Sequence, residues 1–490
     1  MRKAQHLIGG RWADSRDKRT FETVNPATGA ALAEVARGSA ADVDLAVAAA
    51  ERAFSESRWA KDPELRAACL RRVAEGLLRR QADFVQIEVL DTGLPITQAQ
   101  GQAARAAANF TFFAEMATQM TGETYPQPGR FLNYTVRKPV GVAGLITPWN
   151  TPLMLESWKV APCLAAGNSC VLKPAEWSPL SAVLLGEAIA EAGVPEGIFN
   201  IVQGLGEEAG APLVAHPRVP LISFTGETTT GQTIIRSGAE HLKRVSMELG
   251  GKSPVVVFAD ADLNRALDAV VFGVYSLNGE RCTAGSRLLV EDSIYPAFIE
   301  RLARRVAAIS VGDPTDPGTE VGPLIHKEHL KRVQAYLKQA RDEGATVLVG
   351  GERPPGLKSG NFLAPALVTD VQPEMRIVQE EVFGPVLVAM PFHGEAEALS
   401  LANGVRYGLA GYVWTTELTR AHRFAHALEA GMVWVNSQNV RDLRTPFGGA
   451  KDSGIGREGG RYSFDFYTET TTVQVAIGSH AIPKFGVHPD

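Results

Sequence analysis

The clearest pattern in the chain is the alternation, from about residue 140 onward, of short apolar runs with longer amphipathic segments. The first four runs are interpreted as buried strands and cover residues 141–147, 169–174, 199–204 and 221–226. The segments between them, such as 178–193 and 227–239, repeat apolar residues at helical spacing. Strands that alternate with helices predict an α/β fold with a parallel, doubly wound sheet, which binds ligands beyond the carboxyl ends of its strands.

A second region with the same alternation follows a sharp joint. The joint is the stretch MELGGKSP at 247–254, whose paired glycines and proline suit a crossing between domains. Beyond the joint, strands are predicted at residues 255–260, 286–292, 344–351 and 431–437. The chain therefore predicts a second doubly wound unit that ends near Ala450.

The two ends of the chain have different patterns. The first 120 residues read mainly as helices, with Ser39 and Asp42 spaced as a capping box before a helix. The segment 466–478 is rich in Thr and Val and predicts an exposed strand. Because an exposed strand edge tends to pair with another chain, we expect this strand to join copies of the protein in a homo-oligomer.

Composition and charge exclude several classes of function. The chain has 490 residues, enough for two or three domains, and a net charge of −5, which argues against nucleic acid as a partner. It shows neither a signal-peptide pattern nor an apolar run of transmembrane length, so no membrane partner is expected. Its four cysteines lack metal or disulfide spacing, which suits free thiols in the cytoplasm. The pairs His326/His329 and His422/His426 are interpreted as surface residues, and no metal site is predicted.

Cys282 and Glu248 are candidates for nucleophilic catalysis. Cys282 lies in NGERCTAG, among small and charged residues that would stabilise a reachable thiolate, although a structural thiol is the alternative. Glu248 is flanked by Met and Leu, so burial would raise its pKa toward the range of a general base. The alternative for Glu248 is an ion pair with a lysine such as Lys252.

Other polar residues follow the predicted strands. Asn150 ends a strand and suits the stabilisation of an oxyanion, although Asn is also common in turns. Lys173 and Glu176 follow the next strand and are placed to contact ribose hydroxyls, with the carboxylate favouring NAD over a 2′-phosphate. The stretch 224–231 opens a helix after a strand, where phosphate groups bind.

Seven motifs in this order resemble the aldehyde dehydrogenase superfamily: TPWN, KPAE, FTG, MELGGKSP, NGERCTAGSR, EEVFGPV and PFGGAKDSGIGRE. The resemblance covers nearly the whole chain and implies two doubly wound, Rossmann-like domains with a small β oligomerisation arm. It implies an NAD-binding domain at 1–120 and 140–250, a catalytic domain at 251–450, and oligomerisation strands at 121–139 and 464–490.

The resemblance also implies roles for individual residues. Cys282 attacks the aldehyde, Asn150 holds the oxyanion of the thiohemiacetal, and Glu248 activates the water that hydrolyses the thioester. The residues expected to bind NAD are Ile146, Thr147, Pro148, Trp149, Lys173, Glu176, Gly206, Gly210, Phe224, Thr225, Gly226, Leu249, Glu381 and Phe383. One departure is Glu227, where the family often has a serine on the pyrophosphate; we expect this carboxylate to point outward.

Further stretches, among them DTGLPITQAQ and REGGRYSFDFYTE, resemble the 5-carboxymethyl-2-hydroxymuconate semialdehyde dehydrogenases of aromatic catabolism. Such substrates carry carboxylates, which arginine binds through two hydrogen bonds. The expected substrate residues are Arg105 and Arg444, with Arg441 as a third candidate and Phe110 and Phe113 lining a tunnel.

Several alternatives stay open at this stage. They are 2-hydroxymuconate semialdehyde, an aromatic aldehyde or an aliphatic aldehyde as substrate, transfer of the acyl group to coenzyme A, and a non-catalytic NAD-binding protein. The sequence decides neither dimer against tetramer nor the strictness of NAD over NADP.

Overall fold

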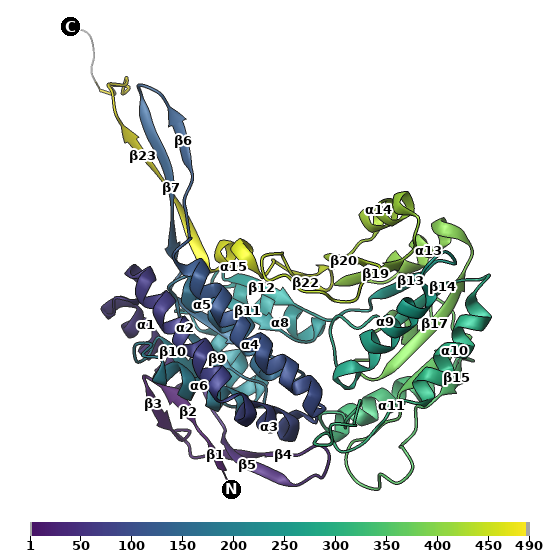
Figure 1. Ribbon diagram of the computed structural model, residues 1–490. Coiled ribbons are helices and arrows are strands. Elements are labelled where there is room, and N and C mark those ends of the chain that lie inside the picture. Colours follow the sequence, from purple (N-terminus) through teal and green to yellow (C-terminus); the bar gives the residue numbers. More distant parts are fainter. Residues whose placement is uncertain (1, 487–490) are drawn as a thin grey trace.

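Two predominantly parallel sheets form the body of the protein, and a narrow β arm projects from it (Figure 1). The computed structural model describes residues 2–486. The predicted pair of doubly wound α/β sheets with a β arm is confirmed, whereas the limits of the domains stay a prediction. Within residues 2–486, no helix combines the length and the apolar character needed to span a membrane.

The first sheet has eight strands, of which the central five are parallel. Their order is β22 (Gly454–Ile455), β12 (Arg244–Glu248), β11 (Leu221–Thr225), β8 (Val142–Ile146), β9 (Ser169–Lys173), β10 (Phe199–Ile201), β2 (His6–Ile8) and β3 (Arg11–Ala13). The helices of this half are α1 (Ala40–Glu56), α2 (Pro63–Arg79), α3 (Gln81–Thr92), α4 (Ile96–Ala117), α5 (Pro152–Ala165), α6 (Leu180–Glu191), α7 (Ala211–Ala215) and α8 (Thr228–Ala239). The carboxyl ends of β8, β9, β11 and β12 thus lie at one edge, which places Asn150, Lys173, Thr225 and Glu248 on the same side of the sheet.

The second sheet has seven strands, all parallel except one edge strand. Their order is β15 (Thr346–Val349), β16 (Ala366–Thr369), β17 (Val386–Phe392), β14 (Arg287–Glu291), β13 (Pro254–Val257), β19 (Ala410–Trp414) and β20 (Met432–Val435). The helices of this half are α9 (Leu263–Tyr275), α10 (Tyr295–Ala307), α11 (Lys327–Asp342), α12 (Arg376–Gln379), α13 (Gly394–Asn403) and α14 (Leu418–Ala427).

The arm is an antiparallel sheet of β6 (Thr124–Gln127), β7 (Phe131–Pro139) and β23 (Thr468–Ala476), with β7 in the centre. α15 (Gly460–Tyr467) leads from the body into β23, which runs out along the arm (Figure 1). The predicted exposed strand at 466–478 is confirmed as β23. Residues 487–490 of the predicted oligomerisation segment lie outside the described residues.

The prediction of a mainly helical N-terminal region is wrong for the first 36 residues. The strands β1 (Arg2–Ala4), β4 (Thr20–Val24) and β5 (Ala31–Ala36) form a small sheet, and β2 and β3 extend the first large sheet. Most of these strands are too short for a clear alternation of buried and exposed positions. Tertiary pairing therefore decides their conformation.

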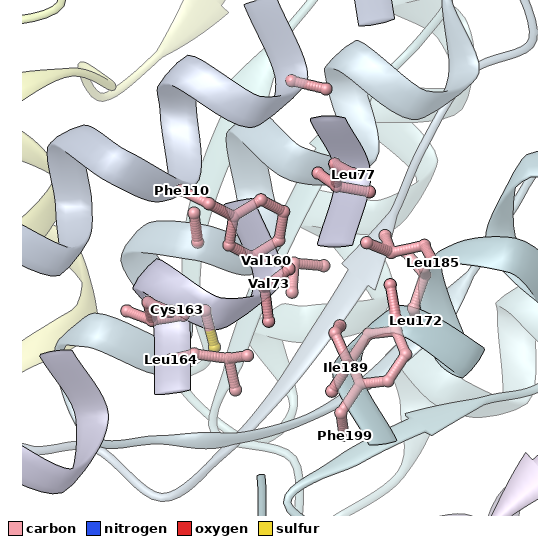
Figure 2. Close-up of a cluster of buried hydrophobic side chains, with 14 of the residues drawn as sticks. Val73, Leu77, Phe110, Val160, Cys163, Leu164, Leu172, Leu185, Ile189 and Phe199 are labelled. Atoms are coloured by element: carbon pink, nitrogen blue, oxygen red, sulfur yellow. The ribbon is translucent and has the colours of Figure 1, made fainter. Parts of the chain in front are cut away.

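Packing between the helices and the first sheet is tight around Phe110. Its ring lies with Val73 and Leu77 of α2 and Cys163 of α5 in one hydrophobic cluster (Figure 2). Phe110 is fully buried there. The expectation that Phe110 lines a substrate tunnel is therefore wrong, because the ring packs into the core.

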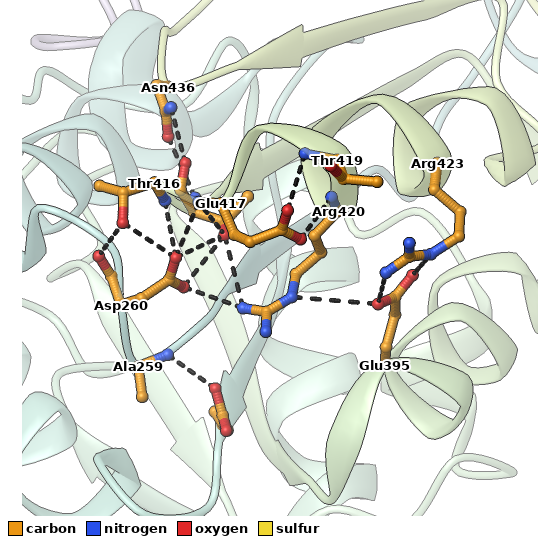
Figure 3. A network of polar contacts seen from close by, with 11 residues as sticks. Ala259, Asp260, Glu395, Thr416, Glu417, Thr419, Arg420, Arg423 and Asn436 are labelled. Atoms are coloured by element: carbon orange, nitrogen blue, oxygen red, sulfur yellow. Dashed lines mark hydrogen bonds and ion pairs between the residues drawn. The ribbon is translucent and has the colours of Figure 1, made fainter.

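A network of hydrogen bonds and ion pairs lies just beyond the end of β13 in the second sheet. The carboxylate of Asp260 accepts hydrogen bonds from the Thr416 and Glu417 backbone N–H groups, at 2.8 and 2.9 Å, and pairs with Arg420 at 3.0 Å (Figure 3). Glu417 in turn caps the first turn of α14. Asp260 thereby ties the end of β13 to the segment that leads from β19 into α14.

Candidate active site

Two cavities meet at Cys282. The α4 cavity runs past Gln102 and Arg105 of α4, and the α11 cavity runs past His329 and Arg332 of α11. Six residues line both cavities: Asn150, Leu155, Thr225, Glu248, Leu249 and Cys282. The structure therefore brings the three residues predicted to be catalytic together at the junction of the two cavities.

A constrained turn positions Cys282. After α9 the backbone passes through Leu277 and Asn278, which have φ values of 55° and 58°, a region that non-glycine residues rarely adopt. The Asn278 side chain fixes this turn, because its amide donates to the carbonyl oxygens of Gly93 and Pro323 and its oxygen accepts the Gly322 N–H. These bonds hold the strained loop so that Cys282 reaches the junction.

Cys282 is a protonated thiol in this environment. Burial raises the pKa of Cys282 to about 11, and the nearby carboxylates of Glu381 and Glu248 act in the same direction. Arg281 and Arg441 favour the thiolate but do not outweigh these effects. The expectation that its neighbours stabilise a resting thiolate is therefore wrong, and the thiol needs a base.

Glu248 is placed to be such a base. It is the last residue of β12 and is 5% exposed, and neither carboxylate oxygen has a hydrogen-bond partner among residues 2–486. Burial, reinforced by Glu458, raises the pKa of Glu248 well above the usual value for a carboxyl group. The alternative role of Glu248 was an ion pair with Lys252. In residues 2–486 the Lys252 amino group has no hydrogen-bond partner, so it does not bond to Glu248.

Asn150 is held by the loop that carries the cysteine. Its side-chain nitrogen donates to the carbonyl oxygen of Glu280 at 2.8 Å, and Asn150 is 6% exposed. The Glu280 carboxylate is fixed in turn by the N–H of Ile325 at 3.0 Å. One amide hydrogen of Asn150 thus orients the side chain, and the other stays available at the junction.

The residues predicted to bind NAD fall into two groups. Pro148, Trp149, Thr225, Gly226, Leu249, Glu381 and Phe383 line the α11 cavity. The others, Ile146, Thr147, Lys173, Glu176, Gly206, Gly210 and Phe224, do not line either cavity; they lie at or just beyond the ends of β8, β9, β10 and β11. Lys173 and Glu176 form an ion pair of 2.7 Å, which lowers the pKa of Glu176.

Aromatic side chains line the α11 cavity beside Glu381, and two of them, Trp149 and Phe383, are among the residues predicted to bind NAD. The Trp149 ring meets the Phe383 ring edge to face, with centroids 5.3 Å apart. The backbone of Phe383 has a φ of 59°, and its carbonyl lies 2.7 Å from Nε2 of His329. Glu381 accepts the N–H of Gly251 at 2.8 Å, and burial raises the pKa of Glu381 to about 7.

The prediction that the histidines of α11 lie on the surface is wrong. His329 is buried and His326 stacks on Trp177, with ring centroids 4.0 Å apart, and both line the α11 cavity. Their spacing on a charged helix resembles that of a surface pair, so only the fold places them at the site. His422 and His426 are exposed on α14, as predicted.

The predicted substrate residues are only partly brought together. Arg105 lines the α4 cavity. Arg444 does not, because its side chain is 80% exposed and pairs with Asp442 at 2.6 Å. Arg441, the third candidate, lines the cavity in its place. Phe113 is fully buried behind Trp158, with ring centroids 6.4 Å apart, so its assignment to the tunnel wall is wrong.

The residues that line the α4 cavity and were not predicted include Trp158, Arg281, Asn439 and Glu458. Arg281 directly precedes Cys282, the predicted nucleophile, and this position in the sequence could have identified Arg281 as a site residue. Trp158 and Glu458 gave no signal, because one lies within a buried helix and the other in a glycine-rich loop.

The chain belongs to the aldehyde dehydrogenase family, which matches residues 12–473. It is therefore an aldehyde dehydrogenase, and the predicted family and enzyme class are confirmed.

The chain is 50% identical over 470 residues to the 5-carboxymethyl-2-hydroxymuconate semialdehyde dehydrogenase of Escherichia coli, covering 94% of this chain and 99% of that relative. It is 45% identical over 487 residues to the 2-hydroxymuconic semialdehyde dehydrogenase of Pseudomonas sp. (strain CF600), covering 97% and 100%. The crystal structure of HpcC from Thermus thermophilus has a TM-score of 0.98 and 53% identity, covering 99% of this chain and 95% of that one. An NAD+ complex of aldehyde dehydrogenase from Bacillus cereus has a TM-score of 0.95 and 41% identity, covering 97% of both chains.

Proposed function

We propose that this aldehyde dehydrogenase uses NAD+ to oxidise a semialdehyde that carries carboxylates, 5-carboxymethyl-2-hydroxymuconate semialdehyde, to the corresponding acid in aromatic catabolism. The similarity to the Escherichia coli enzyme of that name supports the substrate. The similarity to an NAD+ complex supports the coenzyme. The observation that carries the proposed substrate is that two arginines line the cavity beside Cys282 without a carboxylate partner in the described chain.

Arg105 and Arg441 both line the α4 cavity, and neither lies within ion-pair distance of a carboxylate in residues 2–486. The Arg441 guanidinium lies over the rings of Phe447 and Trp158, at 4.0 and 4.8 Å from their centroids, which fixes its plane. Burial lowers the pKa of Arg441 to about 10, so it stays cationic at neutral pH. A cation held beside the nucleophile without an internal partner suits a substrate carboxylate.

Three residues at the junction supply the acid–base and nucleophilic chemistry. Glu248 takes the proton of the Cys282 thiol, and the thiolate attacks the aldehyde carbon to give a thiohemiacetal. The free amide hydrogen of Asn150 and the Cys282 backbone N–H stabilise its oxyanion. Glu248 passes the thiol proton to solvent before the thioester is hydrolysed. It then takes a proton from the water that attacks the thioester and returns a proton to the Cys282 thiolate as the acid leaves.

The residues of the α11 cavity fit NAD+. The hydroxyl of Thr225 is buried without a hydrogen-bond partner in the described chain, and it lines the cavity just before α8. Lys173 and Glu176, which lie at the end of β9 and just beyond it, outside this cavity, would hold the adenosine ribose, while Glu381 and Phe383, which line the cavity, would contact the nicotinamide end. Bound there, NAD+ would supply the acceptor for the hydride that leaves when the thiohemiacetal is oxidised. The Glu176 carboxylate disfavours a 2′-phosphate and so favours NAD over NADP.

The test compares kcat/KM for 5-carboxymethyl-2-hydroxymuconate semialdehyde, 2-hydroxymuconate semialdehyde and benzaldehyde at saturating NAD+. We expect the first substrate to be preferred in the wild type. Arg441→Gln should lower its kcat/KM by about 10- to 100-fold, the effect of losing one charged hydrogen bond, and leave benzaldehyde little changed. Arg444→Gln is the matched control in the same loop and should leave all three values near those of the wild type.

A benzaldehyde preference in the wild type would contradict the proposed substrate class. A loss in Arg444→Gln equal to that in Arg441→Gln would contradict the assignment of Arg441. A second candidate substrate is 2-hydroxymuconate semialdehyde, which the 45% identical relative from Pseudomonas favours. It has one carboxylate fewer, so the same panel distinguishes the two.

The protein is also proposed to be a cytoplasmic homo-oligomer. The outer edge of β23 has no paired strand among the described residues, and the arm exposes Tyr125, Leu132 and Val475. An open edge with exposed apolar side chains suits pairing with a second copy. All four cysteines are free, which suits a reducing compartment.

A further inference from the structure

An ion pair joins the two halves of the protein at the α11 cavity. Glu227 Oε1 lies 3.4 Å from Arg332 Nη1, and both residues line the cavity. Glu227 precedes the first residue of α8, which packs in the first half through Ile234. Arg332 lies on α11, which packs against the second sheet through Val333. The pair therefore connects a helix of one half to a helix of the other.

The charges of this cavity make Glu227 unexpected. Among residues 2–486, the cavity is lined by four residues with carboxyl groups: Glu227, Glu248, Glu328 and Glu381. Arg332 is the one arginine in the lining of this part of the chain, and no lysine lines it. A dinucleotide carries a negatively charged pyrophosphate, which an acidic lining repels. Burial raises the pKa of Glu248 and Glu381, and Lys331 pairs with Glu328 at 2.8 Å, so the pairing of Arg332 bears on the charge of Glu227 that a phosphate meets.

The start of α8 is where a phosphate would bind. The backbone N–H groups of a first helical turn and the helix dipole attract anions, and the unpartnered hydroxyl of Thr225 lies beside this turn. Glu227 occupies the N-cap position, yet its side chain makes no capping hydrogen bond. Its carboxylate reaches across to Arg332 instead, so it neither occupies the free N–H groups nor adds an uncompensated charge. Glu227, expected to point outward, thus lines the cavity and pairs there with Arg332.

We propose that Arg332 is the counter-ion of Glu227, which lets an acidic residue stand at the phosphate-binding end of α8. Arg332 is a positioning residue in this role: it supports coenzyme binding through Glu227 and not through a contact of its own with the coenzyme. The inference rests on the proposed use of NAD. It predicts that Arg332 matters only while Glu227 is acidic.

The test is a double-mutant cycle on coenzyme binding without aldehyde. Dissociation constants of NAD+ and NADH are measured by calorimetry and by NADH fluorescence for the wild type, Arg332→Gln, Glu227→Gln and the double variant. Arg332→Gln should weaken binding by about 5- to 20-fold, because the unpaired carboxylate repels the pyrophosphate. Glu227→Gln should bind at least as tightly as the wild type. The double variant should recover to within about threefold of the wild type, which shows coupling of the two sites.

Salt and a matched variant separate this effect from general damage. The defect of Arg332→Gln should shrink as ionic strength rises from about 20 to about 500 mM, because repulsion between partly exposed charges is screened. Lys338→Gln removes another ion pair of α11, with Asp342, and should leave coenzyme binding unchanged. Thermal unfolding of each variant checks that the fold persists.

Two results would overturn the inference. Binding in the double variant as weak as in Arg332→Gln would show that Arg332 contacts the coenzyme directly, and unchanged binding in Arg332→Gln would show that the pair has no such role. A wild type that binds neither NAD+ nor NADH would overturn the proposed coenzyme as well, so failure of the two proposals is distinguishable.

Discussion

Lys159 Nζ lies 2.9 Å from Glu458 Oε1, and both side chains are almost fully buried beside the junction of the two cavities. The hydroxyl of Ser223 bridges the same groups, at 2.9 Å from the ammonium and 3.1 Å from the carboxylate. Glu458 lines the α4 cavity and raises the pKa of Glu248. The pair therefore links a buried cation to the proposed base.

Removal of the cation should be costly. Lys159→Met leaves the Glu458 carboxylate buried without its partner, so we expect the free energy of unfolding to fall by about 3–5 kcal/mol. Urea unfolding monitored by circular dichroism measures this change. The double variant Lys159→Met/Glu458→Leu removes both charges and should recover most of the loss. A double variant less stable than Lys159→Met would contradict this account.

Glu248→Gln should slow both proton transfers assigned to Glu248. The amide cannot take a proton from the Cys282 thiol or from water, so formation of the thioester and its hydrolysis should each fall by about 100-fold or more. Rapid mixing of enzyme, NAD+ and aldehyde should then show NADH forming slowly from the first turnover, without the fast first turnover of the wild type. In the wild type the steady-state rate should rise with pH, because the raised pKa of Glu248 keeps it protonated at lower pH. A Gln variant with the wild-type pH profile would exclude Glu248 as the base.

Two buried carboxyl groups of α3, those of Glu88 and Asp91, should make the free energy of unfolding depend on pH. Burial raises the pKa of both Glu88 and Asp91 to about 7. Because the folded state favours the protonated forms, their contribution is fully present below about pH 4 and is lost as pH rises through about 7. For Glu88 alone the loss is roughly 3 kcal/mol, from about 1.4 kcal/mol per pH unit.

Glu88→Gln tests this dependence. The variant should lose less stability than the wild type between about pH 5 and 8, as measured by denaturant unfolding. Glu75→Gln, on the exposed face of α2, is the control and should follow the wild-type curve. Parallel curves for Glu88→Gln and the wild type would show that Glu88 does not carry the effect.

The apolar and polar pattern of short segments was enough to predict the strands that carry the site. The apolar runs that end in Gly, Pro or Thr became β8, β9, β10 and β11, and their ends carry Asn150 and Thr225. The pKa of Cys282 could not be predicted, because it is raised first by burial within the fold and then by the carboxylates of Glu381 and Glu248, which are distant in the sequence.

Arg441 and Arg444, in the loop after β20, also show where prediction from the sequence ends. Arg444 and Arg441 lie three residues apart, and both follow the same strand. Arg444 pairs with its neighbour Asp442 and stays exposed, whereas Arg441 lies over the ring of Phe447, six residues further on, and over that of Trp158 from the distant helix α5. Only these tertiary contacts decide which of the two arginines lines the cavity.

Oligomerisation through the arm can be tested at the free edge of β23. Val475 and Ile477 are 42% and 60% exposed; they lie at the end of β23 and just beyond it, and neither lines the α4 or the α11 cavity. In the double variant Val475→Glu/Ile477→Glu, two copies would bring like charges together where apolar contacts are proposed. We expect light scattering after gel filtration to show a smaller species than the wild type. Lys484→Glu, near the C-terminal end, changes the charge without touching the strand and should leave the mass unchanged. A wild type that runs as a monomer, or a double variant of unchanged mass, would contradict the proposed role of β23.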